Sequence, residues 1–265
     1  MFDRFDRSIT YLRISVTHAC NLRCVYCAPP DGAPQRSRAD LLTPEQMTEV
    51  ARAAVRLGVT KIRLTGGEPL MRPDIVELVR MLAGIDGLAH IAMTTNATLL
   101  APLAAPLRDA GLQSVNISLD TLDPARYREL TRGGNLDSAL AGLHAALAVH
   151  LRVKVNMVIL GSTTSAEISG LRDFCAASGA RLQLIDHFDL SQPKKERAAM
   201  DRPPPCGGCN RIRLMADGML KPCLQANDEI PLDFSRLEES LREAILSKPR
   251  RGGVCTNRAM SQIGG

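Results

Sequence analysis

Strand-like and helix-like segments alternate along this chain of 265 residues, and that order limits the folds open to it. Apolar and polar residues alternate with period two over residues 11–17, 60–65, 90–96, 113–120, 152–159 and 181–187. The stretches between them have the apolar spacing of helices over residues 44–57, 73–84, 101–110, 137–149 and 165–178. This order predicts right-handed βαβ units and a parallel sheet, either open or curled into a barrel.

The two faces of the predicted strands differ in chemistry. In the first strand Leu12 and Ile14 share one face, Arg13 and Ser15 share the other, and later strands repeat this division. A parallel strand buried on both faces would be almost entirely apolar, and a closed barrel fills its interior with branched side chains. The sequence therefore predicts an α/β fold with an incomplete barrel, whose polar strand faces line a wide interior. An antiparallel sheet with one solvated face is the alternative, which the intervening helices disfavour.

Several basic residues occupy the polar strand faces, namely Arg13, Lys61, Arg63 and Lys154. If they converge, they predict an anionic ligand, and phosphate is favoured because Arg offers paired donors and Lys a point charge. Each could instead be a charge on the protein surface. Although the net charge is +5, aromatic residues make up only 3% of the chain and Trp is absent, so nucleic acid is disfavoured as a partner. A small anionic substrate is the better interpretation.

Three cysteines, Cys20, Cys24 and Cys27, directly follow the first predicted strand. A [4Fe-4S] cluster normally takes four thiolates, so a loop that offers three leaves one iron open for another ligand. A structural zinc site is the alternative, but it needs four closed ligands, and no fourth Cys or His follows closely. This loop therefore favours an open iron–sulfur site.

Residues 1–7 mix charges with apolar residues and predict neither a signal peptide nor a membrane span. We therefore expect a cytoplasmic protein without a membrane partner. That compartment keeps thiols reduced, so the eight cysteines are not expected to form disulfides, and the clustered spacing favours metal binding. Cys175 lies at an apolar position of a predicted helix and is expected to be buried in the core.

The cysteine loop resembles that of the radical S-adenosylmethionine superfamily, as does the sequence Gly66-Gly67-Glu68-Pro69 after the second strand. The resemblance implies a partial (β/α)6 barrel and a [4Fe-4S] cluster whose open iron binds the methionine part of S-adenosylmethionine. The cluster's electron then cleaves this cofactor to a 5′-deoxyadenosyl radical. Cofactor-binding residues implied in the same way are Tyr26, Gly66, Gly67, Glu68 and Ser118.

A second cysteine set, Cys206, Cys209 and Cys223, resembles the second cluster motif of the GTP 3′,8-cyclases, which begin molybdenum-cofactor synthesis. The resemblance implies a second [4Fe-4S] cluster and GTP as substrate. Residues that match the family's GTP ligands, together with Lys61 from the strand pattern, are Arg13, Lys61, Arg63, Thr94, Lys154, Arg211 and Arg213. Zinc stays an alternative at this second set, with Cys255 or His187 as fourth ligand.

The chain also ends like this family, in Ile263-Gly264-Gly265, a double-glycine tail that the resemblance places in the active site. We expect Arg211, Arg213, Gly264 and Gly265 to act in catalysis. The expected division is a barrel over residues 1–190 and a second-cluster region with the tail over residues 191–265. Flavodoxin or ferredoxin is the expected electron donor, and a homodimer is left open.

Two departures from the family concern the substrate. Gln183 stands in the last barrel strand where the family has an Arg, and only residues 188–205 connect that strand to the second cysteine set, where family members have several dozen more. They leave open a compact relative that acts on a different nucleotide, a sugar or a peptide. A third hypothesis is an iron–sulfur electron carrier or redox sensor, which would need neither a basic interior nor the Gly-Gly-Glu-Pro turn.

Overall fold

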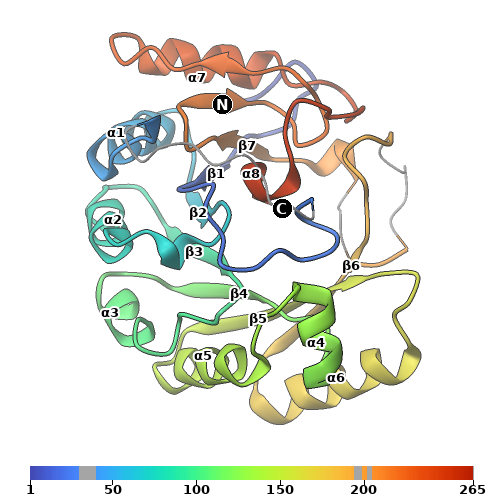
Figure 1. Ribbon diagram of the computed structural model, residues 1–265. Coiled ribbons are helices and arrows are strands. Elements are labelled where there is room, and N and C mark those ends of the chain that lie inside the picture. The colour runs from blue at the N-terminus through green and yellow to red at the C-terminus, as the bar shows by residue number, and fades with distance from the viewer. Residues whose placement is uncertain (30–39, 194–198, 202–204, 265) are drawn as a thin grey trace.

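The computed structural model describes residues 1–29, 40–193, 199–201 and 205–264, and one sheet forms their centre (Figure 1). Its strand order is β6-β5-β4-β3-β2-β1-β7-β8-β9. The first six strands are β1 (Tyr11–Ser15), β2 (Lys61–Thr65), β3 (His90–Thr95), β4 (Ser114–Ser118), β5 (Arg152–Ile159) and β6 (Arg181–Asp186). They are mutually parallel, and β6 does not pair back onto β1, so the predicted incomplete barrel is confirmed.

A second group of strands continues the sheet beyond β1. It comprises β7 (Arg211–Leu214), β8 (Met219–Lys221) and β9 (Ile230–Pro231). Strand β7 pairs with β1 in parallel, while β8 and β9 follow in antiparallel order. The sheet therefore runs without interruption from the expected barrel region into the expected second-cluster region, and the division at residue 190 stays a prediction.

Most helices cover the outer side of the curved sheet (Figure 1). They are α1 (Pro44–Arg56), α2 (Ile75–Ala83), α3 (Ala104–Asp109), α5 (Leu136–Ala148), α6 (Ser165–Ser178) and α7 (Leu237–Leu246). In contrast, α4 (Pro124–Thr131) is joined to the cysteine loop by backbone hydrogen bonds from Arg23 and Val25. The short α8 (Met260–Ile263) lies on the inner side, near the C-terminus (Figure 1). None of the helices described is long and apolar enough to cross a bilayer.

Local sequence signals explain where these helices begin. In α1 the Thr43 side chain accepts from the Gln46 amide and the Gln46 side chain accepts from the Thr43 amide, and α6 has the same capping box at Thr164 and Glu167. The apolar strand residues, such as Leu12, pack against these helices in one large core, in which Cys175 is buried as predicted.

The six predicted strands and five predicted helices are all present, with ends within three residues of the predicted bounds. The sequence analysis missed α4, although Asp123 followed by Pro124 is a helix-start signal and the Asp123 side chain accepts from the Arg126 amide. It also missed β7 to β9, α7 and α8, because the three strands are short and their pairing depends on distant partners.

Candidate functional site

The cysteine loop leaves β1 and is joined to the glycine-rich end of β2 by backbone hydrogen bonds. The Gly67 amide donates to the Thr17 carbonyl at 2.8 Å, and the Glu68 amide donates to the Ala19 carbonyl at 2.8 Å. A Cβ atom on Gly67 would lie 2.1 Å from the Ala19 carbonyl oxygen, and Gly66 has φ +139°. Only glycine allows the two segments to approach this closely.

A cavity lies beside this junction, and the predicted cofactor residues line it. We call it the cysteine-loop cavity; its walls include Tyr26, Gly66, Gly67, Glu68, Ser118 and the three cysteines Cys20, Cys24 and Cys27. The fold therefore brings together two motifs that are about forty residues apart in the sequence. The functional roles of these residues stay predictions.

Glu68 is buried at this junction and joins the ends of two strands. Its carboxylate accepts from the Thr95 hydroxyl at 2.7 Å, from the Asn96 amide at 2.7 Å and from the Leu70 amide at 3.0 Å. Burial raises the pKa of Glu68 to about 7, although these hydrogen bonds oppose the shift. Glu68 thus fixes the ends of β2 and β3 at the cavity wall.

Tyr26, within the cysteine loop, is tied to the barrel by a residue that the sequence analysis missed. The Tyr26 hydroxyl donates to Asp120 at 2.7 Å, and the other oxygen of this carboxylate accepts from the Val158 amide at 2.8 Å. Burial raises the pKa of Asp120 to about 6. Asp120 lies two residues after Ser118, so both side chains are on the same face of the extended chain. This spacing could have identified Asp120 as a site residue.

The chemistry of the first cysteine set fits iron–sulfur ligation. Burial raises the pKa of Cys20, and burial together with the charge of Cys20 raises the pKa of Cys27 to about 12. A bound cation would favour the thiolate form of these residues, which burial disfavours. In the described part of the chain, no three Cys, His, Asp or Glu side chains lie close enough together to hold a single metal ion. Thiolates bonded to different irons of a cluster do not need that proximity.

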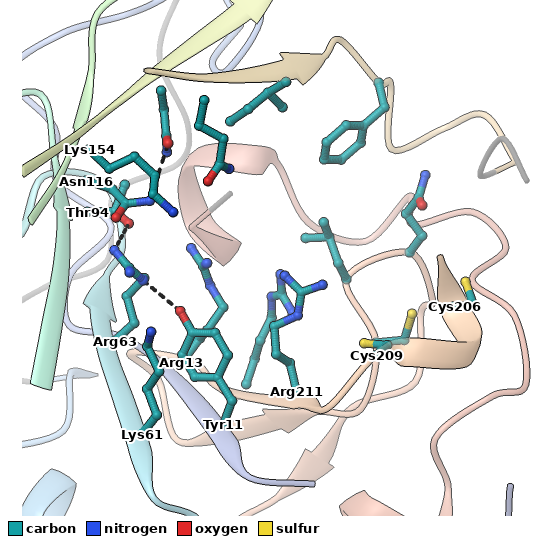
Figure 2. Close-up of a pocket in the computed structure, with 18 of the residues that line it drawn as sticks. Tyr11, Arg13, Lys61, Arg63, Thr94, Asn116, Lys154, Cys206, Cys209 and Arg211 are labelled. Carbon is teal, nitrogen blue, oxygen red and sulfur yellow. Dashed lines mark hydrogen bonds between the residues drawn. The ribbon is translucent and has the colours of Figure 1, made fainter. Parts of the chain in front are cut away.

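The second cavity lies over β7, β1 and β2 and is rich in cations (Figure 2). We call it the basic cavity; it is lined by every predicted substrate residue and by Cys206, Cys209 and Cys223. Figure 2 shows Arg13 and Arg211 between Arg63 on one side and Cys209 on the other. None of the described Asp or Glu residues lines this cavity. The convergence of these basic side chains on one cavity favours an anionic ligand.

Strand register places three buried guanidinium groups in one row across the cavity. Arg13 on β1 pairs with Arg63 on β2 and with Arg213 on β7. Burial, followed by the charges of Arg213 and Arg63, lowers the pKa of Arg13 to about 9. Burial and the charge of Arg211 lower the pKa of Arg213 to about 10. The row therefore exists at an electrostatic cost that an anion would relieve.

Tyr11 lies in the adjacent row, between its register partners Lys61 and Arg211, and the sequence analysis did not select it. Its hydroxyl accepts from Arg63 Nε at 2.6 Å, and the same guanidinium donates to the Thr94 hydroxyl at 3.2 Å (Figure 2). Burial opposes ionisation of Tyr11, but the charges of Arg13, Arg63 and Lys61 lower its pKa to about 8. Tyr11 is therefore an acidic group of this cavity whose pKa responds to the surrounding positive charge.

Lys248 is a further cation that only the tertiary structure reveals. Its ammonium group donates to the Arg211 carbonyl at 2.8 Å and to the Pro222 carbonyl at 2.9 Å. Burial opposes ionisation of the nearby Cys209, but the charges of Lys248 and Arg211 lower the pKa of this thiol to about 6. The second cysteine set thus has a thiolate-forming member in an electropositive setting, which suits a metal cluster.

The two cavities adjoin, because four residues line both: Thr94, Asn156, Ile185 and Phe188. The fold therefore places the two cysteine sets at different ends of one continuous interior. Gln183 is buried in the wall of the basic cavity, at the position where the resemblance led us to expect an Arg.

The two candidate fourth zinc ligands lie outside the basic cavity. Cys255 is buried against Leu190, Met215 and Ile263, and His187 lines the cysteine-loop cavity instead. Neither residue therefore completes a zinc site at the second cysteine set, as far as the structure describes it.

The C-terminal tail reaches the boundary of both cavities. The Gly264 carbonyl accepts from Arg13 Nη2 at 3.2 Å, and the Gln262 carbonyl accepts from the Ser15 hydroxyl at 3.0 Å. Gly264 has φ +70°, and a Cβ atom there would lie 2.4 Å from the Thr65 hydroxyl oxygen. The tail therefore needs glycine at this position. Gly265 lies outside the described residues.

Comparisons with known sequences agree with these features. A family model described as the radical SAM superfamily matches residues 14–175. The chain is 39% identical to the GTP 3′,8-cyclase of Alkaliphilus oremlandii over 320 aligned positions, and the match covers 100% of each protein. It is 38% identical to the GTP 3′,8-cyclase of Moorella thermoacetica over 323 positions, again covering 100% of each. Since this chain has 265 residues, at least 55 positions of the first alignment have no residue of it.

Solved structures share the fold at much lower identity. SuiB from Streptococcus suis, bound to S-adenosylmethionine, has a TM-score of 0.70 at 18% identity, and the match covers 95% of this chain and 66% of SuiB. The protein anSMEcpe, with bound AdoMet, has a TM-score of 0.69 at 12% identity, covering 91% of this chain and 81% of that protein. These similarities support the same architecture.

Proposed function

Because this chain belongs to the radical SAM superfamily and, within it, to the GTP 3′,8-cyclase family, we propose that it converts GTP to 3′,8-cyclo-7,8-dihydro-GTP in molybdenum-cofactor biosynthesis. The proposal includes two [4Fe-4S] clusters and S-adenosylmethionine as cofactors. An external one-electron donor such as flavodoxin or ferredoxin and a cytoplasmic location belong to it too, and a homodimer stays a prediction.

The observation that carries the proposal is the row of Arg213, Arg13 and Arg63 across the basic cavity. Paired donors in this arrangement suit the closely spaced charges of a triphosphate. Lys61 and Lys154 add point charges from the neighbouring strands. Each hydrogen bond to a charged phosphate oxygen contributes about 1.5–3 kcal/mol, so several of them account for firm binding.

The first cysteine set would hold the cluster that, once reduced, supplies the electron for cleaving S-adenosylmethionine. In our proposal Gly66 and Gly67 hold the cysteine loop at the cavity, because a Cβ atom on either would collide with the backbone of Thr17 or Ala19. Tyr26 and Ser118 contribute to the walls of the same cavity, and Asp120 holds Tyr26 in place. These residues bind and orient the cofactor, while the adjoining basic cavity positions the substrate.

The second set, Cys206, Cys209 and Cys223, would hold a cluster with an iron open toward the substrate base. We assign Arg211, Arg213 and the tail to the reacting end of the substrate. Positioning matters most in this reaction, since a reactive radical needs a fixed near neighbour and little water. The buried Arg213 and the inserted Gly264 both restrict the space available there.

The test is an anaerobic assay of the protein with both clusters reconstituted. Incubation with dithionite, S-adenosylmethionine and GTP is expected to yield 5′-deoxyadenosine and the 3′,8-cyclised nucleotide in equal amounts, measured by mass spectrometry. A Cys24→Ser variant is the control for background cleavage. Formation of 5′-deoxyadenosine without consumption of GTP would overturn the assignment of substrate.

Gln183 favours a second candidate, a related enzyme acting on a different nucleotide, a sugar or a peptide. Its amide lines the basic cavity together with Asn116 and Asn156, so this wall offers neutral donors and acceptors rather than a further charge. Competition between GTP, GDP and ATP for binding separates the candidates. Binding of GTP at least about tenfold tighter than ATP supports the cyclase, and equal binding supports the alternative.

A further inference from the structure

Arg258 lies two residues before α8 and makes three buried contacts with carboxylates. Its Nε and Nη2 atoms donate to the two oxygens of Glu229 at 2.8 and 2.6 Å, and Nη1 donates to Asp217 at 2.7 Å. The side chains of Arg258, Asp217 and Glu229 are only 8%, 2% and 11% exposed. We call these three residues the Arg258 clamp. Paired donors to a carboxylate fix both distance and orientation, which Lys cannot do.

The clamp fixes the segment that leads into the tail. Upstream, the Cys255 amide donates to the Leu190 carbonyl at 2.7 Å and the Thr256 amide to the Asn227 side chain at 2.8 Å. Downstream, the Ile263 side chain is buried, and the tail carbonyls reach Ser15 and Arg13. Arg258 is therefore the last residue with a charged side chain before the tail, and its ion pairs fix the chain just before it reaches the two cavities.

The clamp also connects the tail to the second cysteine set. Glu229 accepts from Lys221 at 3.3 Å, and Lys221 is fully buried on β8, two residues before Cys223. Asp217 lies in the turn between β7 and β8. Two cations and two carboxylates thus form a compact buried group whose charges balance. Removing the guanidinium would leave two carboxylates with one ammonium group, which a buried site does not tolerate well.

We propose that Arg258 is a positioning residue that holds the C-terminal tail at the boundary of the two cavities, in register with the segment that bears Cys223. Through this contact Gly264 is held within hydrogen-bond distance of Arg13 and against Thr65. The effect on catalysis rests on the proposed function, whereas the effect on the tail does not. Arg258 donates hydrogen bonds to Glu229 and Asp217, and neither of these residues lines the basic cavity.

Amide hydrogen exchange tests whether Arg258 holds the tail in place. It is measured on the protein with both clusters reconstituted and without GTP. In Arg258→Met the amides of Gln262, Ile263 and Gly264 are expected to exchange at least about tenfold faster, while those of β1 and α1 stay protected. Arg258→Lys should give an intermediate rate. Arg56→Met removes the exposed Arg56–Glu238 ion pair between α1 and α7 and is the matched control, expected to leave the tail unchanged. Unchanged exchange in the tail, or equal acceleration throughout the sheet, would overturn the proposal.

The ratio of cyclised product to 5′-deoxyadenosine tests whether Arg258 affects catalysis. Arg258→Met is expected to retain the KM for S-adenosylmethionine and to form 5′-deoxyadenosine, but the ratio of cyclised product to 5′-deoxyadenosine should fall about tenfold or more. A wild-type ratio in this variant would overturn the catalytic role. If the wild type forms no cyclised product, the proposed function fails, and the exchange experiment still decides the role of Arg258.

If Arg258→Met does not fold, Asp217→Asn tests the role of the clamp instead. This change weakens one contact and leaves the paired contact to Glu229. It is expected to accelerate exchange in the tail by a smaller factor and to lower the coupling ratio in proportion. No change in either quantity would count against the clamp.

Discussion

Single residues of the basic cavity have pKa values that burial and the charges of their neighbours shift. Arg13 and Arg213 have lowered pKa values because burial and neighbouring guanidinium groups both disfavour the cation. Positive charges nearby also lower the pKa of Tyr11, because they favour its ionised phenolate form. Binding of an anion would reverse both effects, so these residues couple ligand binding to protonation.

Replacing Arg213 is expected to weaken ligand binding without lowering the stability of the protein. Its Nε atom is buried without a hydrogen-bond partner among the described residues. Arg213→Met should weaken GTP binding about 10- to 100-fold, since a charged hydrogen bond contributes about 1.5–3 kcal/mol. The nucleotide-free variant should unfold at the same or a higher temperature, because one of three repelling cations is gone. Isothermal titration and calorimetry measure the two effects, and unchanged GTP affinity would show that the row does not bind substrate.

Tyr11 predicts the pH dependence of nucleotide binding. Its pKa is about 8 in the free cavity, and a bound triphosphate would raise this value by cancelling the surrounding positive charge. Above pH 8 Tyr11 must therefore take up a proton when the nucleotide binds. The affinity for the nucleotide should then fall by up to about tenfold per pH unit. Tyr11→Phe keeps the ring and should flatten this dependence between pH 8 and 9, below the range in which Arg13, with a pKa of about 9, also titrates. Titrations across that range in both proteins measure it, and equal slopes would exclude Tyr11 as the titrating group.

Among the structural elements, the junction between β2 and the cysteine loop depends on the absence of side chains. Two backbone hydrogen bonds hold the segments together, and the glycines leave no room for a Cβ atom. The loop that would carry the first cluster is therefore positioned by the end of a strand rather than by its own sequence.

Gly67→Ala tests this junction. The added methyl group would lie 2.1 Å from the Ala19 carbonyl oxygen, so the loop must move. We expect S-adenosylmethionine cleavage to fall at least about 100-fold, because a displacement of about 1 Å is enough for such a loss. Gly170→Ala in α6 is the matched control; its methyl group meets nothing within 4 Å, and it should stabilise the helix by up to about 1 kcal/mol. Retention of cleavage in Gly67→Ala would contradict the assignment of this junction to the cofactor.

Across the whole molecule, one sheet positions two cysteine sets that lie far apart in the sequence. Because β7 pairs with β1, the second set faces the basic cavity, which adjoins the cavity of the first set. The two proposed cluster sites could therefore be removed separately.

Iron content and product analysis of two variants test this division. Each cluster contains four irons, so Cys24→Ser and Cys209→Ser should each retain about four iron atoms per chain of about eight in the wild type. Cys24→Ser should lose S-adenosylmethionine cleavage altogether. Cys209→Ser should still cleave the cofactor but form no cyclised nucleotide. Zinc in place of iron at either site, or full cleavage by Cys24→Ser, would contradict the two-cluster proposal.

Local patterns were sufficient to predict the parallel strands, most helices and both cysteine sets, because strand parity and cysteine spacing depend on residues a few positions apart. They also predicted that Arg13, Lys61, Arg63 and Lys154 line one interior. Tyr11 escaped selection because an isolated Tyr at the start of a strand has no distinctive pattern. Lys248 escaped because its partners lie in distant segments, whereas Asp120 shares a strand face with Ser118 and could have been selected.

The sequence by itself determined which side chains share a face of each strand, since the alternation of a β-strand is a local property of the backbone. Only the tertiary structure decided that β7 is the neighbour of β1, and with it the row of three Arg residues and the clamp that holds the tail. Which strands pair is decided by burial and hydrogen bonds between segments about two hundred residues apart, such as the bond from Thr10 to Asn210. No short-range pattern records such a choice.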